Sequence, residues 1–299
     1  MYDMIIIGAG PAGMTAAIYA RRAEKSVLVL EAKSYGGQII STPEIENYPA
    51  APHISGFDFA TKVYEQACEL GAEFKFERVT GITDGEVKTV ATSRGSYESR
   101  AVIIATGSEC RRLGVEGEEK LIGKGISYCA TCDGGFFRKK TVAVVGGGNT
   151  ALEDALYLTA LAAKVYVIHR RDAFRGDSST VEKLKAKENL EFVLNSRVTR
   201  LISEDKLKGI EVTDNTGAVK VLDIDGLFVA VGRTPENSPF ASLIDLDDAG
   251  YAKASENCRT RTPGIFVAGD NRTKEVRQLV TAAADGAAAA GEAIKYLDR

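Results

Sequence analysis

The sequence predicts an α/β fold in which two Rossmann-like domains each combine a parallel sheet with a small antiparallel meander. A short apolar run, Met4–Ile7, leads into Gly8-Ala-Gly10-Pro-Ala-Gly13, and apolar residues at helical spacing follow. The same order of elements starts again at Thr141, where Val142–Val145 leads into Gly146-Gly-Gly148-Asn-Thr-Ala151. Strand, glycine loop and helix in this order are the unit that binds dinucleotides in doubly wound folds. The chain therefore contains two copies of one design.

The first glycine loop predicts a dinucleotide site near the start of the chain. Its glycines permit a tight turn and let the backbone approach a pyrophosphate, which rests on the positive N-terminus of the next helix. The following strand, Ser26–Leu30, ends at Glu31, twenty-three residues after Gly8. An acid at this position accepts hydrogen bonds from both hydroxyls of a ribose that carries no phosphate. The alternative is a glycine turn that binds nothing.

The rest of the first domain follows from turn residues and apolar runs. A polar loop contains Gly36-Gly37-Gln38 and Asn47. We expect a helix at Gly56–Leu70, a meander at Val79–Arg100 with turns at Asp84-Gly85 and Arg94-Gly95, and a separate apolar strand, Val102–Ala105, ending at Thr106-Gly107.

The second domain repeats this plan, and the end of the chain returns to the first. We expect a helix to about Ala162, a strand at Val165–Ile168, a helix at Thr180–Lys187, a meander at Val198–Ile224 and a strand at Leu227–Gly232. A last strand, Gly264–Ala268, ends at Gly269-Asp270 and precedes an alanine-rich helix, Gln278–Leu297. The predicted domains are residues 1–111 with 237–299, and residues 112–236.

The two copies differ at the position where the first has Glu31, the residue expected to bind the ribose hydroxyls. Twenty-three residues after Gly146 stands His169, followed by Arg170 and Arg171, with Arg175 one helical turn on. The planar guanidinium fork matches phosphate oxygens, so a 2′-phosphate is the expected ligand and NADPH is favoured over NADH. A solvated surface cluster is the alternative.

A cysteine pair lies between the two glycine loops, in Cys129-Ala-Thr-Cys132-Asp133. Two thiols at this spacing can close a small disulfide ring, and the spacing commonly lowers the pKa of one thiol. This predicts redox chemistry. The alternatives are half of a zinc site, a structural disulfide, or two thiols buried as small hydrophobes.

Composition excludes other classes of protein. A net charge of −3 gives no basic footprint for nucleic acid, and 44% hydrophobic with 26% charged residues is ordinary for a globular chain. No apolar run approaches the roughly 18 to 20 residues needed to span a bilayer, so no membrane partner is expected. Without a signal peptide, the expected location is cytoplasmic.

Together these motifs resemble those of the bacterial low-molecular-weight thioredoxin reductases, over essentially the full length. The resemblance rests on both glycine loops, Gly36-Gly-Gln38, Ala105-Thr-Gly107, the cysteine motif, His169-Arg-Arg-x-x-x-Arg175 and Gly269-Asp270 with Arg277-Gln278. A cysteine pair inside the nucleotide unit that carries the arginines is the most specific of these.

The resemblance implies that the first domain holds FAD, the second holds NADPH, and thioredoxin is the substrate of a homodimeric enzyme. The FAD residues would be Gly8, Gly10, Pro11, Ala12, Gly13, Glu31, Gly37, Gln38, Asn47, Val79, Ala105, Thr106, Gly107, Gly269, Asp270, Arg277, Gln278 and Leu279. The NADPH residues would be Gly146, Gly148, Asn149, Thr150, Ala151, His169, Arg170, Arg171, Arg175 and Arg233. No metal is expected.

In such enzymes the second cysteine, here Cys132, faces the flavin, and the first, here Cys129, attacks the partner's disulfide. Asp133 would then manage the proton of the leaving thiol. Because the dithiol shares a domain with the NADPH loop, we expect the domains to rotate about the segments Arg111–Gly125 and Arg233–Ser238.

Two departures from the family pattern stand out, Asn271 and the run Gly176-Asp-Ser-Ser179. The second bears on the strength of NADPH binding. Alternative functions are a flavin disulfide reductase fed by ferredoxin, one serving a glutaredoxin, a peroxiredoxin-linked domain or oxygen, and a redox sensor that binds nucleotides without turnover.

Overall fold

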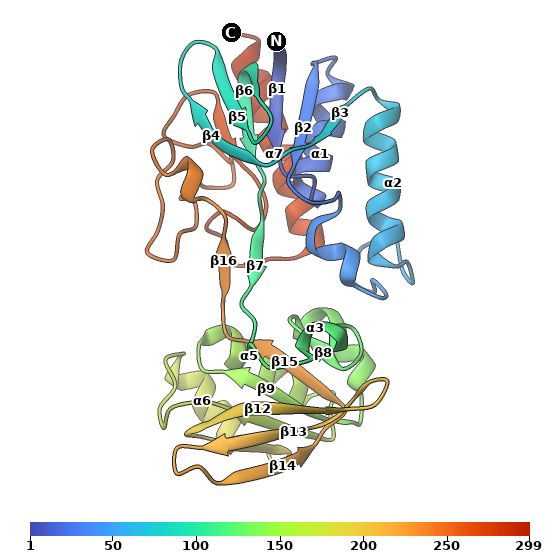
Figure 1. The fold of residues 1–299 in the computed structure, drawn as a ribbon, viewed down its shortest axis with the longest axis vertical. Coiled ribbons are helices and arrows are strands. Elements are labelled where there is room, and N and C mark those ends of the chain that lie inside the picture. The colour runs from blue at the N-terminus through green and yellow to red at the C-terminus, as the bar shows by residue number, and fades with distance from the viewer. The chain divides into compact units, whose positions relative to one another are not determined.

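The computed structural model describes all residues from 1 to 299 and divides into two compact units (Figure 1). Residues 1–109 and 234–299 form the first unit, and residues 110–233 form the second. The sequence analysis placed these boundaries after residues 111 and 236. The predicted α/β class, with parallel sheets and antiparallel meanders, is confirmed.

A seven-stranded sheet forms the centre of the first unit, in the order β3-β2-β1-β6-β5-β4, with β17 also paired to β6. The pairs β3–β2, β2–β1 and β1–β6 are parallel. The pairs β6–β5 and β5–β4 are antiparallel, and β5 pairs only with the first half of β6. The strands are β1 (Tyr2–Ile7), β2 (Val27–Glu31), β3 (Glu73–Phe76), β4 (Val79–Thr83), β5 (Lys88–Thr92), β6 (Ser96–Ile104) and β17 (Ile265–Val267).

Strand β1 is buried on both faces, as its continuous apolar run predicts. Met4 and Ile6 belong to the core beneath the helices, and Ile5 and Ile7 belong to the core on the opposite face, with Phe240. All four side chains of this run are at most 4% exposed. This double burial fixes the register of the strand that carries the first glycine loop.

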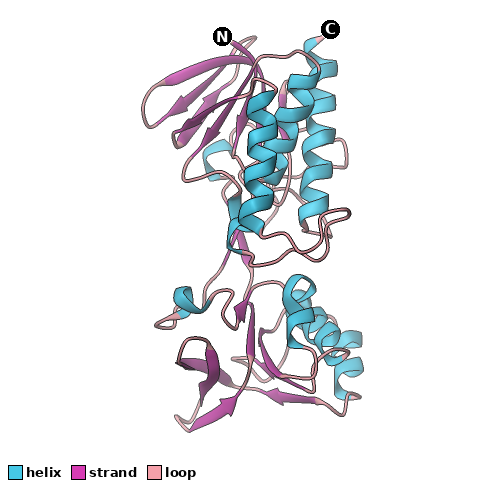
Figure 2. Cartoon of the chain, turned by 90° about the vertical axis from the view of Figure 1, so that its right-hand side faces the viewer, coloured by secondary structure: helices cyan, strands magenta, loops and turns pink.

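Three long helices cover one face of this sheet (Figure 2). They are α1 (Pro11–Arg22), α2 (Gly56–Glu69) and α7 (Leu279–Leu297), and two short 3-10 helices, η1 (Gly37–Ser41) and η3 (Ser238–Phe240), complete the unit. Helix α7 packs closely on α1 because a Cβ added at Gly286 would lie only 2.2 Å from the Ala12 carbonyl oxygen. The small residues of α7 therefore bring the end of the chain against its beginning.

The expected division between a meander strand ending at Arg100 and a separate strand starting at Val102 is wrong. One continuous strand, β6, spans both. Its first half pairs antiparallel with β5, with Ser99 opposite Lys88, and its second half pairs parallel with β17, with Val102 opposite Ile265. The alternating pattern of the first half gives way to a continuous apolar run in the second half because the neighbouring strand changes from β5 to β17. No turn separates the two halves.

The second unit repeats the plan with a five-stranded parallel sheet, in the order β11-β10-β9-β15-β8, and a separate three-stranded antiparallel sheet, β12-β13-β14. The strands are β8 (Ile126–Ser127), β9 (Thr141–Gly146), β10 (Lys164–Ile168), β11 (Leu190–Val193), β12 (Ser196–Ser203), β13 (Leu207–Asp214), β14 (Val219–Asp223) and β15 (Gly226–Ala230). The helices are α3 (Glu118–Leu121), α4 (Ala130–Asp133), η2 (Gly134–Phe137), α5 (Asn149–Thr159) and α6 (Ser178–Lys185).

Two short strands, β7 (Ser108–Cys110) and β16 (Arg233–Pro235), pair with each other where the chain passes from one unit to the other. The sequence analysis did not foresee them. None of the helices combines the length and the apolar character that a bilayer crossing requires.

Candidate active site

The first glycine loop joins the carboxyl end of β1 to α1, as predicted. Gly8 has a φ of 106°, and a Cβ added there would lie 2.4 Å from the Ala105 carbonyl oxygen at the end of β6. A Cβ at Gly13 would lie 1.9 Å from the Gly8 carbonyl oxygen, whereas one at Gly10 would meet nothing within 4 Å. Two glycines therefore serve the packing of strand and helix, and Gly10 leaves its side of the loop open to a ligand.

Glu31 ends β2 with its carboxylate at this loop, as an adenosine-binding acid requires. Its Oε2 accepts a hydrogen bond from Ala9 N at 2.8 Å, and its Oε1 accepts one from Lys33 N at 2.8 Å. Gly37 comes to the same loop from η1, because a Cβ there would lie 3.3 Å from Gly10 Cα. The structure thus collects Gly10, Glu31 and Gly37 around one open position.

The neighbouring residues of the first unit carry polar atoms that lack protein partners. Thr106 Oγ1 and Arg277 Nε are buried and have no hydrogen-bond partner. Arg277 stacks on Tyr251, with its Cζ 4.3 Å from the ring centroid. Buried polar atoms without a partner are uncommon, so both are expected to bond to a ligand.

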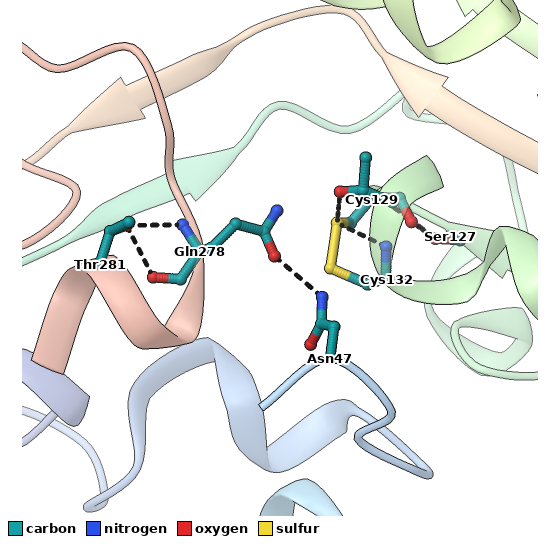
Figure 3. Close-up of a disulfide and its surroundings, with 7 residues drawn as sticks. Asn47, Ser127, Cys129, Cys132, Gln278 and Thr281 are labelled. Carbon is teal, nitrogen blue, oxygen red and sulfur yellow. Dashed lines mark hydrogen bonds between the residues drawn. A yellow bond between two sulfur atoms is a disulfide. The ribbon is translucent and has the colours of Figure 1, made fainter. Parts of the chain in front are cut away.

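Asn47 and Gln278, which are 231 residues apart in the chain, meet at the start of α7 (Figure 3). Asn47 Nδ2 donates to Gln278 Oε1 at 3.1 Å, and Gln278 N donates to Thr281 Oγ1 at 3.1 Å. Gln278 caps the helix, so Leu279 is its first residue. Gln38 Nε2 donates to the Ser108 carbonyl oxygen beyond β6.

The second glycine loop repeats the geometry of the first. A Cβ added at Gly146 would lie 2.4 Å from the Ala230 carbonyl oxygen at the end of β15, and one at Gly148 would meet nothing within 4 Å. Ala151 takes the place of Gly13, and Asn149 and Thr150 open α5. The opening between two parallel strands is the ligand crevice of a doubly wound sheet.

His169 closes one side of this loop. Its ring lies where a Cβ at Gly147 would be, and it stacks on Phe174 with a centroid distance of 5.2 Å. Burial lowers the pKa of His169, and the neighbouring arginines add to this effect, so the ring is neutral at pH 7. Its Nε2 is buried without a partner.

Arg170, Arg171 and Arg175 are exposed and follow His169 in a loop that is held to the glycine loop. Arg175 N donates to the Gly147 carbonyl oxygen at 2.8 Å. This bond brings the arginine loop to the glycine loop, as a reader of a 2′-phosphate requires.

The run Gly176-Asp-Ser-Ser179, which departs from the family pattern, packs against the start of α5. The sequence did not predict this contact. A Cβ at Gly176 would lie 2.9 Å from Asn149 N, and Asp177 N donates to Asn149 Oδ1 at 2.8 Å. Asp177 then caps α6, because its Oδ1 accepts from Ser179 N. Gly176 is therefore required by close packing, and the change from helix formers has a structural reason.

Cys129 and Cys132 form a disulfide with a Cα–Cα distance of 5.3 Å (Figure 3). Cys129 caps the short helix α4, where its sulfur accepts a hydrogen bond from Cys132 N at 3.2 Å. Cys129 N donates to Ser127 Oγ at 3.0 Å. A backbone N–H aimed at a sulfur stabilises its thiolate once the bond is reduced, which is the state that attacks disulfides.

Asp133 ends α4, and its N–H donates to the Cys129 carbonyl oxygen at 3.1 Å. The residues predicted to be catalytic, Cys129, Cys132 and Asp133, thus lie together on one helical turn and its N-cap. No group of three or more Cys, His, Asp or Glu side chains is arranged to hold a metal ion.

A buried acid that the sequence analysis missed supports the cysteine segment. Glu118, 3% exposed, accepts hydrogen bonds from Leu113 N at 3.0 Å, from Gly114 N at 2.9 Å and from Tyr128 Oη at 2.6 Å. Burial and the bond to Glu118 raise the pKa of Tyr128. Glu118 therefore connects the segment that enters the second unit with the residue just before Cys129.

The remaining predicted residues occupy less decisive places. Val79 begins β4 opposite Thr92, and Arg233 begins β16. Gly107, with a φ of 67°, follows Thr106 after β6. Gly269 and Asp270 follow β17, whose parallel pairing with β6 confirms the expected late return of the chain to the first unit.

A family profile described as "Pyridine nucleotide-disulphide oxidoreductase" matches residues 2–286, nearly the whole chain. The chain belongs to the pyridine nucleotide-disulphide oxidoreductase family. Among curated relatives in this family, a thioredoxin reductase of Listeria monocytogenes is 44% identical over 301 residues, which cover 100% of this chain and 94% of that protein.

Solved structures in the family extend the similarity to three dimensions. A thioredoxin reductase from Streptococcus pyogenes is 42% identical with a TM-score of 0.96, covering 100% of this chain and 98% of that one. A Lactococcus lactis thioredoxin reductase, described as the FR conformation, is 40% identical with a TM-score of 0.69, covering 100% of this chain and 99% of that one.

The arginine loop predicts the choice of nicotinamide cofactor. Replacing Arg171 with Ala removes a charged hydrogen bond of about 1.5–3 kcal/mol, so KM for NADPH is expected to rise roughly 10- to 100-fold while KM for NADH stays unchanged. Steady-state kinetics with both cofactors measures this. Arg197→Ala, at an exposed position on β12, is the matched control. Equal losses with both cofactors would contradict a reader of the 2′-phosphate.

A second prediction concerns Asp154, which lies on α5 behind the second glycine loop. Burial, and to a lesser degree Glu153, raise the pKa of Asp154 from its usual 3.8 to about 7, although Arg233 opposes the shift. Between pH 3.8 and about 7, the Asp154 carboxyl is ionised in the unfolded chain but protonated in the folded protein. The free energy of unfolding therefore falls as pH rises from about 4 to 7.

Asp154→Asn is expected to remove this penalty, so it leaves stability unchanged near pH 4 and raises it by roughly 2–4 kcal/mol at pH 8. Urea unfolding at both pH values measures the difference. Asp205→Asn, in the exposed turn between β12 and β13, is the control. A gain that is the same at both pH values would show that the carboxyl is not protonated in the folded state.

Proposed function

We propose that this chain is an NADPH-dependent flavoprotein that reduces the disulfide of thioredoxin. The observation that carries the proposal is the Cys129–Cys132 disulfide on one helical turn of the unit that also holds the second glycine loop and its arginines. Full-length similarity to proteins named thioredoxin reductase supports it. A sensor without turnover would need no acid such as Asp133 beside the pair.

The first unit fits FAD. Gly10 leaves space for a pyrophosphate at the start of α1, Glu31 suits an unphosphorylated ribose, and the buried Thr106 Oγ1 and Arg277 Nε lack partners. Asp270, Asn47 and Gln278 lie at the adjoining loop and helix start. FAD supplies two-electron chemistry that connects hydride donors with dithiols.

The second unit fits NADPH. Gly148 leaves its side of the loop open, His169 Nε2 is buried without a partner, and the arginine loop is bonded to Gly147. Because both cofactor sites keep the residues that their ligands require, electrons supplied as NADPH suit this chain better than electrons from ferredoxin.

The dithiol performs the last step by thiol–disulfide exchange. The Cys129 thiolate attacks one sulfur of the thioredoxin disulfide and forms a mixed disulfide, and the second thioredoxin sulfur leaves as a thiolate that takes a proton managed by Asp133. Cys132 then attacks Cys129, which releases the other thioredoxin sulfur as a thiol and closes the Cys129–Cys132 disulfide. Two electrons pass to thioredoxin for each pair oxidised.

Single cysteine variants test this assignment. Cys132→Ser is expected to retain FAD and to lose its visible absorbance when NADPH is added without oxygen, yet to reduce thioredoxin at least about 1,000-fold more slowly, as removal of a covalent nucleophile does elsewhere. Cys129→Ser should show the same loss. Cys68→Ser, on α2 of the first unit, is the control and should be fully active.

Stopped-flow absorbance and a thioredoxin reduction assay give both readouts. Thioredoxin reduction retained by Cys132→Ser would overturn the roles given to the pair. A wild-type protein that binds FAD but is not reduced by millimolar NADPH would favour ferredoxin as the electron donor.

The two units are proposed to rotate during turnover, because the dithiol must exchange electrons inside the enzyme and also reach another protein. A Lactococcus lactis thioredoxin reductase is described by a named conformation, FR, which supports more than one conformation for that protein. The first crossing segment contains Gly114 and Gly117, and Gly232 directly precedes the second, each with a positive φ.

Fluorescence energy transfer between probes at Glu69 and Lys206, exposed positions in different units, tests the rotation. Two populations whose ratio changes when NADPH is added are expected. A single unchanged efficiency in the oxidised and reduced enzyme would exclude the rotation.

A homodimer and a cytoplasmic location are part of the proposal. We place the interface on helix α2, where Phe57 is 55% exposed. A redox-active pair that must be reduced in each cycle suits a reducing compartment.

A further inference from the structure

A buried cluster of charges lies beneath the loop that follows β17, and the proposed function leaves it unexplained. Asp285, in the middle of α7, accepts hydrogen bonds from two of the three nitrogens of the Arg272 guanidinium, with Nε to Oδ2 and Nη2 to Oδ1 both at 2.7 Å. Lys274 Nζ lies 3.0 Å from Oδ2. The three side chains are 2–6% exposed.

The carboxylate also holds backbone. Gly269 N donates to Asp285 Oδ2 at 2.9 Å. Gly269 has a φ of 86°, and a Cβ added there would lie 2.9 Å from Ala12 Cβ in the first turn of α1. Asp285 therefore holds the backbone of Gly269 by a hydrogen bond at the point where the Gly269-Asp270 loop lies against α1.

The cluster reaches the start of α7 as well. Arg277 Nη2 donates to the Arg272 carbonyl oxygen at 3.3 Å, and Arg272 Nη1 donates to the Ala254 and Thr273 carbonyl oxygens. Arg272 thus connects residues 254, 273 and 277 with the carboxylate. The other charged group at the cluster is Glu256, which is 93% exposed and 3.3 Å from Arg272.

Stability alone does not account for these charges. Burying two cations and a carboxylate carries a large desolvation cost, and apolar side chains of similar volume often stabilise a core as well or better. Burial opposes ionisation of Asp285, but hydrogen bonds from Arg272 and Lys274 outweigh it and hold the pKa of Asp285 below its usual value. The carboxylate is charged at neutral pH and acts as a permanent acceptor for Gly269 N.

We propose that Asp285, together with Arg272, is a positioning residue for the flavin nucleotide. The ion pair fixes the Gly269-Asp270 loop and the start of α7 against α1 before the ligand binds. The ion pair thereby holds the C-terminal part of the FAD site against α1, which lies near the start of the sequence. Fewer backbone segments then have to become ordered when FAD binds, which lowers the entropic cost of binding. The inference rests on the proposed assignment of FAD to the first unit.

Asp285→Asn tests the proposal, because an amide keeps the shape and an acceptor for Gly269 N but loses the charge that orients Arg272. The protein is stripped of FAD and titrated with FAD, and Kd is measured from quenching of flavin fluorescence. Kd is expected to rise roughly 10- to 100-fold, the effect of losing a charged hydrogen-bonded contact. Hydrogen exchange of residues 265–275 in the stripped protein is expected to become faster.

Lys88→Met is the matched control. Lys88 is also buried in the first unit and bonds Asp84 at 2.9 Å and the Gly85 carbonyl oxygen at 2.8 Å, so its replacement removes an ion pair between a buried lysine and a 42% exposed carboxylate outside the Gly269 loop. This variant is expected to be less stable but to bind FAD with a Kd within about twofold of the wild type, because it leaves the loop bonds intact.

Equal changes in Kd for Asp285→Asn and Lys88→Met, or a Kd unchanged in Asp285→Asn, would overturn the positioning role. If Asp285→Asn does not fold, Arg272→Lys takes its place, since it keeps the charge and loses the bidentate bond. The Kd of this variant is expected to rise roughly 3- to 10-fold, and an unchanged value would overturn the proposal. A wild-type protein that does not bind FAD would instead refute the proposed function.

Discussion

Close backbone contact at the two glycine loops is the constraint on which the rest of the structure depends. Gly8 meets the end of β6 at Ala105, and Gly146 meets the end of β15 at Ala230, each so closely that a Cβ would lie 2.4 Å from a carbonyl oxygen. Because the strands on either side are parallel and buried, their carboxyl ends open one crevice in each unit.

The two units share one fold, but the charged residues beside their glycine loops favour different nucleotides. In the first unit Glu31 brings a carboxylate to the loop, and in the second His169 fills that side as a neutral ring while the arginine loop is bonded to Gly147. A carboxylate repels a 2′-phosphate and guanidinium groups attract it. One duplicated fold can therefore hold a flavin nucleotide and a phosphorylated nicotinamide nucleotide without exchanging them.

Buried charges connect parts of each unit that the chain separates. Glu118 ties the entry segment of the second unit to Tyr128 beside the cysteine pair, and Asp285 ties the loop after β17 to α7. Each carboxylate accepts backbone N–H groups that would otherwise lack a partner, so the loops are held in one conformation. Both acids stand next to residues proposed to handle electrons or their carrier.

The sequence by itself determined the two strand–loop–helix units, the glycine loops, Glu31, the arginines and the cysteine pair, because each is a local pattern whose spacing follows from backbone geometry. Only the tertiary structure decided that β6 serves two neighbours, that Gly176 docks on α5, that Asn47 bonds Gln278 across 231 residues and that Arg272 pairs with Asp285. These depend on which distant segments the folded chain brings into contact, and no periodicity along the chain encodes such a pairing.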